Sequence, residues 1–190
     1  MVFIFSLPGF LLIFYHPWVA TITFSSKLYN SLLINASIMS FYLIPIFFFV
    51  AFNNNKFFAA KKNYLVIPTF FSILMVCLLS IWFDYNYQIG GGFLLKLSFL
   101  LFNNKLLFYS SAIFGFTLLT YLSIENRNNC LLILIMLFGF SAWFIFQKYL
   151  EPLFLIVFFL IFNSEIPKEF LKNYKNLFYL FIYVCLYFIS

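Results

Sequence analysis

Long apolar segments without charges recur along this chain, and they limit the possible folds more than any other feature. A helix needs roughly 20 apolar residues to cross the hydrocarbon core of a bilayer, and the segments near that length are Val2–Phe24, Leu32–Phe52, Tyr64–Phe83, Leu106–Ile124 and Cys130–Phe146. Two shorter runs, Leu153–Phe162 and Leu177–Ile189, span only if they tilt or extend into their polar flanks. The pattern predicts an all-α, polytopic transmembrane bundle of six to seven helices in one domain, residues 1–190.

Composition supports the same class. Only 8% of the residues are charged, against roughly 25% in an ordinary soluble domain. A soluble domain of 190 residues has too little interior for so many apolar side chains, whereas lipid surrounds most of a membrane protein. We therefore expect an integral membrane protein with the lipid bilayer as its first partner. The net charge of +6 comes from scattered bases, which argues against nucleic acid as a partner.

The ten-residue run Phe93–Phe102 is too short to cross a membrane and carries Lys96 in its middle. We expect it to form a short interfacial or re-entrant helix after the glycine triplet that precedes it.

The distribution of basic residues in the loops predicts the orientation of the chain. With the N-terminus in the cytoplasm, the cytoplasmic loops hold seven bases and the opposite loops hold four. Cytoplasmic loops carry the excess of Lys and Arg, so this orientation is favoured, in a membrane that we expect to be the bacterial inner membrane. Two polar stretches, Asp84–Gly92 and Gln147–Pro152, then emerge together on the extracytoplasmic face.

The first of these stretches belongs to the most polar part of the chain, DYNYQIGGGFLLKLS, which begins at Asp84. Its three glycines require a turn, and backbone N–H groups at such a turn can bind an anion such as the phosphate of a lipid-linked donor. Asp84 and Gln88 can hydrogen-bond to sugar hydroxyls, and the neighbouring tyrosines can pack on sugar faces. The alternative interpretation is an ordinary loop with interfacial aromatic residues.

The second stretch places a base, a tyrosine and a proline where an apolar helix begins, a position at which proline is well tolerated. Its sequence, Lys148-Tyr149-Leu150-Glu151-Pro152, resembles the Arg-Tyr-x-x-Pro motif. GT-C-type membrane glycosyltransferases, which take sugars from polyprenyl-phosphate donors, often carry that motif at the start of a late helix. Lysine replaces the arginine here, so a point charge replaces a bidentate phosphate ligand.

The resemblance implies an enzyme, or a fragment of one, that handles a polyprenyl-phosphate-linked sugar on the extracytoplasmic face. Its substrate-binding residues would be Asp84, Gln88, Lys148, Tyr149 and Glu151, with Lys148 against the donor phosphate. No catalytic residue is assigned, because the family's acidic residue lies in a large loop after its first helix, and the first loop here, Ser25–Ser31, has no acid. The chain would then correspond to the C-terminal half of such an enzyme.

The alternative function is that of a non-catalytic structural or assembly subunit, with another membrane subunit as its partner. Such subunits are apolar and need no site of their own. We expect no cofactor and no metal site. The three cysteines lie in separate apolar runs, and the single histidine, His16, has no acidic or histidine neighbour in the sequence.

Overall fold

All the regular structure that the computed structural model describes is helical, and the described residues are 28–53, 55–86, 88, 90–139 and 145–189. The elements in chain order are α3 (Leu28–Asn53), α4 (Asn55–Ile81), α5 (Phe93–Phe102), α6 (Leu106–Glu125), α7 (Arg127–Phe138), α8 (Gln147–Ile156), the π-helix η1 (Val157–Ile161), α9 (Glu165–Leu171) and α10 (Tyr174–Ile189). The predicted all-α class is confirmed for this part of the chain. The predicted helix Val2–Phe24 lies outside the described residues.

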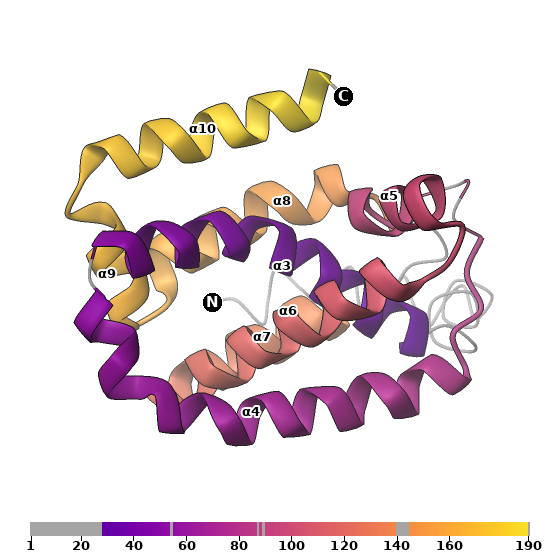
Figure 1. Cartoon of the computed structure of the whole chain (residues 1–190), viewed down its shortest axis with the longest axis horizontal. Helices are drawn as coiled ribbons and strands as arrows, with labels where there is room; N and C mark the ends of the chain where they lie inside the picture. Colours follow the sequence, from indigo (N-terminus) through magenta and orange to yellow (C-terminus); the bar gives the residue numbers. More distant parts are fainter. Residues whose placement is uncertain (1–27, 54, 87, 89, 140–144, 190) are drawn as a thin grey trace, which may run out of the picture.

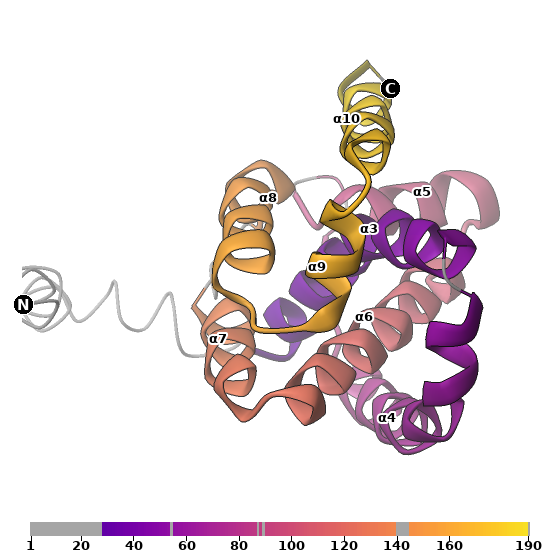
Figure 2. The same cartoon turned by 90° about the vertical axis from the view of Figure 1, so that its left-hand side faces the viewer.

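Successive long helices run back and forth between two ends of the molecule (Figure 1). One end holds residues 82–86 and 90–92 and the start of α8 (Figure 1), and we call it the glycine-loop end. The other end holds the junction between α3 and α4 and the short helix α9. Figure 2 shows α10 standing at the outside of the bundle next to α3. The two polar stretches singled out from the sequence therefore lie at the same end.

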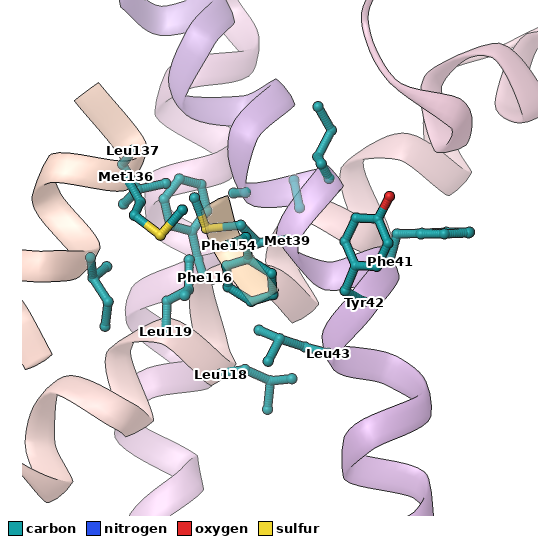
Figure 3. Close-up of a cluster of buried hydrophobic side chains, with 14 of the residues drawn as sticks. Met39, Phe41, Tyr42, Leu43, Phe116, Leu118, Leu119, Met136, Leu137 and Phe154 are labelled. Atoms are coloured by element: carbon teal, nitrogen blue, oxygen red, sulfur yellow. The ribbon is translucent and has the colours of Figure 1, made fainter. Parts of the chain in front are cut away.

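Helix α3 forms the centre of the bundle, and most of its side chains from Asn30 to Val50 are buried. Figure 3 shows how side chains from α6, α7 and α8 gather around it, with Met39 and Leu43 among Phe116, Leu119, Met136 and Phe154. The hydroxyl of Tyr42 lies at the edge of this cluster and points away from it (Figure 3). The side chains drawn in Figure 3 are thus apolar apart from the Tyr42 hydroxyl at the border of the cluster.

Small residues allow α3 and α6 to approach each other closely. A Cβ atom added at Gly115 would lie 2.2 Å from the carbonyl oxygen of Ala36, so only glycine fits at this crossing. The hydroxyls of Ser37 and Ser111 are hydrogen-bonded across the same interface at 2.7 Å. Close approach through small residues, supplemented by buried hydroxyl contacts, is the usual way in which helices pack within a membrane.

Two of the described helices are long and apolar enough to cross a membrane, Leu28–Phe52 and Leu106–Glu125. The helices Gln147–Ile161 and Glu165–Leu171, which meet at an angle of 94°, make a third candidate if they form one span. The apolar parts of α4 and α7, Leu65–Ile81 and Arg127–Phe138, are shorter than this length. The described residues thus contain two or three candidate spans.

Helix α5 has the bounds predicted for the short helix, Phe93–Phe102. It begins directly after Gly92, whose φ of 81° no ordinary helix residue adopts, and it ends at Asn103 in the left-handed conformation. The helix is therefore limited on both sides by local backbone turns, and it lies against α3 and α6 at the glycine-loop end (Figure 1).

Candidate functional site

The loop from Asp84 to Gly92 is hydrogen-bonded to the segment that leads into α8. The backbone N–H of Gly91 donates to the carbonyl oxygen of Ile145 at 2.9 Å. The N–H of Ile145 in turn donates to the Tyr85 hydroxyl at 3.1 Å. These bonds join residues that are more than 50 positions apart in the sequence, so the fold itself brings the two polar stretches together.

The backbone conformation of the glycine triplet and its lack of side chains allow this contact with Ile145. Gly90, Gly91 and Gly92 have φ values of 77°, 81° and 81°, which residues with a Cβ atom rarely adopt. A Cβ atom at Gly90 would lie 2.7 Å from the Ile145 carbonyl oxygen, and one at Gly92 would lie 2.8 Å from Cγ1 of Ile38. The triplet therefore lets the loop lie directly on α3 and on the start of α8.

Burial of Tyr85 has an electrostatic consequence. Its hydroxyl is removed from solvent, and the resulting desolvation raises the pKa of Tyr85 above its ordinary value. Hydrogen bonds from the backbone of Ile145 and Gly91 favour the ionised form, but they do not offset the desolvation. Tyr85 therefore stays neutral and acts here as an acceptor that holds the loop.

Gln147, the first residue of α8, connects three elements. Its side chain is only 4% exposed. Its Oε1 accepts a hydrogen bond from the N–H of Phe93 at 2.9 Å, and its Nε2 donates to the Tyr42 hydroxyl at 2.7 Å. One amide thus holds the start of α5 and the middle of α3 against α8.

Glu151 lies one helical turn further along α8, on the same buried side. It is 7% exposed, and the Tyr42 hydroxyl hydrogen-bonds to its carboxylate. Its Oε2 has no hydrogen-bond partner within the described part of the chain. Gln147, Tyr42 and Glu151 form a continuous buried polar row at the border of the core.

A pocket of about 470 Å³ opens beside this row. The glycine loop, α5, the start of α8 and the end of α10 surround it, and the residues that line it are Gly90, Gly92, Phe93, Lys96, Leu97, Leu100, Phe146, Gln147, Lys148 and Tyr187. Two lysines from different elements and three aromatic rings therefore face one cavity, which we call the lysine pocket. Its walls offer positive charge and flat apolar surfaces to the same ligand.

The five predicted site residues are distributed unequally around this pocket. Lys148 lines it, and Gln88 lines an adjoining hollow of about 360 Å³ that also contains Lys96. Glu151 lies in the buried row behind the pocket. Asp84 and Tyr149 line neither of these two cavities. The backbone of Asp84 is instead bound to the Asn30 side chain, and Tyr149 is 61% exposed, with the Lys148 ammonium 5.1 Å from its ring centre.

Among the lining residues that the sequence did not indicate as site residues are three with polar side chains: Lys96, Gln147 and Tyr187. Lys96 had a signal, since a charge inside a short apolar helix is unusual. Gln147 lies in the polar stretch that the sequence singled out, but its role depends on partners 54 and 105 positions away. Tyr187 gives no signal, because one tyrosine in an apolar segment looks like many others.

The site contains no metal centre in the part of the chain that the structure describes, where no group of three or more His, Cys, Asp or Glu side chains lies close enough to hold an ion. The pocket can instead hold an anion by charge.

Comparison with known proteins adds no further indication: no protein-family model matches this chain. No curated protein and no solved structure shows significant similarity to it.

Proposed function

We propose that this protein binds the phosphate-bearing headgroup of a polyprenyl-linked sugar in the lysine pocket, as a membrane glycosyltransferase of the GT-C type or a part of one. The observation that carries the proposal is that Lys96 of α5 and Lys148 of α8 line the same cavity. Two point charges at the mouth of a pocket attract a phosphate or diphosphate, the group that such donors carry.

The aromatic residues of the pocket suit the sugar part of the same ligand. Phe146 directly precedes α8 and Tyr187 belongs to α10. The Tyr187 ring packs edge-on against Phe93 at 5.3 Å between ring centres. Flat apolar faces beside charged and hydrogen-bonding groups are what a sugar phosphate requires, because its ring has an apolar face and its substituents are polar.

The position of the pocket agrees with a ligand that resides in the membrane. The pocket lies at one end of a bundle in which α4 exposes apolar side chains, including Val66, Ile67 and Phe70. We place this end on the extracytoplasmic side of a bacterial inner membrane, with a cytoplasmic N-terminus and six to seven spans. The shorter helices would cross in a locally thinned bilayer or with their polar flanks extending the span.

We assign no catalytic residue. Asp84 lies outside the pocket, and Glu151 is turned into the buried row with Tyr42. Lys96 and Lys148 therefore serve in recognition of the donor.

Binding of a polyprenyl monophosphate to the purified protein in lipid nanodiscs tests the proposal. Each Lys-to-phosphate contact is a charge-assisted interaction of about 1.5–3 kcal/mol, so Lys96→Ala and Lys148→Ala should each weaken binding by at least tenfold. The matched control is Lys172→Ala, which removes the same charge at the opposite end of the molecule and should leave binding unchanged. Equal binding by all three variants would refute the lysine pocket as the headgroup site and would favour the alternative of a non-catalytic subunit.

A further inference from the structure

A second cavity, of about 670 Å³, lies on the other side of α5. Its walls are Ile44, Phe48 and Ala51 of α3, Leu94 and Leu97 of α5, and Phe114 of α6, together with neighbouring residues of the same helices. None of the lining residues is charged, and Ser110 and Ser111 are its polar ones. We call it the apolar groove.

The apolar groove and the lysine pocket meet at Leu97. This half-buried side chain of α5 lines both cavities. All the positive charge lies on one side of the boundary, at Lys96 and Lys148, and the hydrocarbon surface lies on the other. The combined surface therefore matches a molecule with an anionic head and a long apolar chain, and it does not match a water-soluble sugar phosphate, which would leave the groove empty.

We propose that the apolar groove binds the hydrocarbon chain of the lipid whose phosphate lies at Lys96 and Lys148, with the chain passing over Leu97. The inference rests on the proposed function and adds to it where the polyprenyl chain runs: along α5, between α3 and α6. Binding of the hydrocarbon chain in the apolar groove fixes the position of the headgroup, because the two parts of one lipid molecule occupy the two cavities at the same time. The protein then selects long-chain phosphates over short-chain ones.

Photo-crosslinking tests the path of the chain. The probe is a polyprenyl monophosphate that carries a diazirine in the isoprene units next to the phosphate, and the crosslinked peptides are mapped by mass spectrometry. The expected products lie in 44–51 of α3 and 107–114 of α6. Ser110→Trp fills the groove from an exposed position and should lower their yield by about tenfold, and it should weaken binding of the long-chain phosphate without affecting a short-chain phosphate ester.

Controls distinguish failure of the groove from failure of the headgroup site. Ser80→Trp makes the same substitution on α4, outside both cavities, and should change nothing. If Ser110→Trp leaves the crosslinks unchanged while Lys96→Ala with Lys148→Ala abolishes binding, the groove proposal is wrong and the headgroup site stands. If groove crosslinks persist at full yield in the double lysine variant, or with uncharged polyprenol, the groove takes any hydrocarbon and the shared-ligand proposal is overturned.

Discussion

Replacement of Gln147 by leucine should destabilise the whole glycine-loop end of the molecule. Gln147→Leu keeps the approximate size of a side chain that is 4% exposed, but it removes the acceptor of the Phe93 N–H and the donor to the Tyr42 hydroxyl. Each buried polar group that loses its partner costs about 1–3 kcal/mol. Two such losses give an expected decrease of about 2–6 kcal/mol in the free energy of unfolding.

Thermal unfolding in detergent, followed by far-UV circular dichroism, measures this effect. For a protein of this length, 1 kcal/mol corresponds to roughly 2–4 °C in Tm, so Gln147→Leu should lower Tm by roughly 4–24 °C. Gln88→Leu is the matched control, because Gln88 is exposed and lines only the adjoining hollow. A surface change of this kind usually alters stability by no more than about 0.5 kcal/mol.

A double-mutant cycle with Tyr42→Phe assigns the loss to the proposed contact. Tyr42→Phe removes the same hydrogen bond from the other side, so the double variant should lose less stability than the two single variants together, by about 0.5–3 kcal/mol. If Gln147→Leu is as stable as Gln88→Leu, or if the two losses simply add, Gln147 does not connect α3, α5 and α8 as described.

Three further predictions concern packing, pH and topology. Gly115→Ala places a Cβ atom 2.2 Å from the Ala36 carbonyl oxygen. It should lower the free energy of unfolding by about 1–3 kcal/mol in the same assay. The pKa of Tyr85 is higher in the folded protein than in the unfolded chain, where it is about 10. The stability that Tyr85 contributes is therefore complete below about pH 10 and is lost as pH rises through the folded pKa. Tyr85→Phe should accordingly flatten the decline of Tm above about pH 10. In a background without the native cysteines, Gln88→Cys and Tyr149→Cys should be labelled by an impermeant thiol reagent from outside, and Lys172→Cys should not.

Each of these predictions has its own control. Ser110→Ala, on an exposed part of α6, should leave stability nearly unchanged where Gly115→Ala does not. A Tyr149→Phe variant, which alters an exposed tyrosine, should keep the alkaline decline that Tyr85→Phe loses. Labelling of Gln88→Cys and Tyr149→Cys from opposite sides would show that the two stretches are separated by the membrane, and the lysine pocket would then be wrong.

Local sequence was sufficient to predict α5. The run Phe93–Phe102 is apolar, it follows three glycines and it precedes two asparagines, so both of its limits are local backbone signals. Helix α7 was predicted less well, since it begins at Arg127, three residues before the predicted apolar segment. The Asn126 side chain accepts a hydrogen bond from the N–H of Asn128 and starts the helix within the polar loop. Apolarity alone does not show such a cap.

The structure brings the two polar stretches singled out from the sequence to one end of the molecule, but it distributes the five predicted site residues unequally. Lys148 lines the lysine pocket, and its role in substrate binding stays a prediction. Glu151 was expected to contact a ligand, yet it is 7% exposed and bound to Tyr42. Asp84 was expected beside it, yet its backbone is bound to Asn30 and its side chain lies outside the pocket. Residue type predicts which chemistry is possible, whereas the direction of a side chain depends on its neighbours in space.

The sequence by itself determined the class of this protein, because the cost of placing a segment in water or in lipid is a sum over its own residues. It also determined where the chain must turn, at residues whose backbone preferences are local. Only the tertiary structure decided three features of the site. These are the partners of Gln147, the common cavity of Lys96 and Lys148, and the meeting of the two cavities at Leu97. Helices such as α3 and α6 are apolar on all sides, so they carry no amphipathic pattern that fixes their rotation. Close contacts such as that between Gly115 and Ala36 set this rotation, and it in turn selects the side chains that face each other.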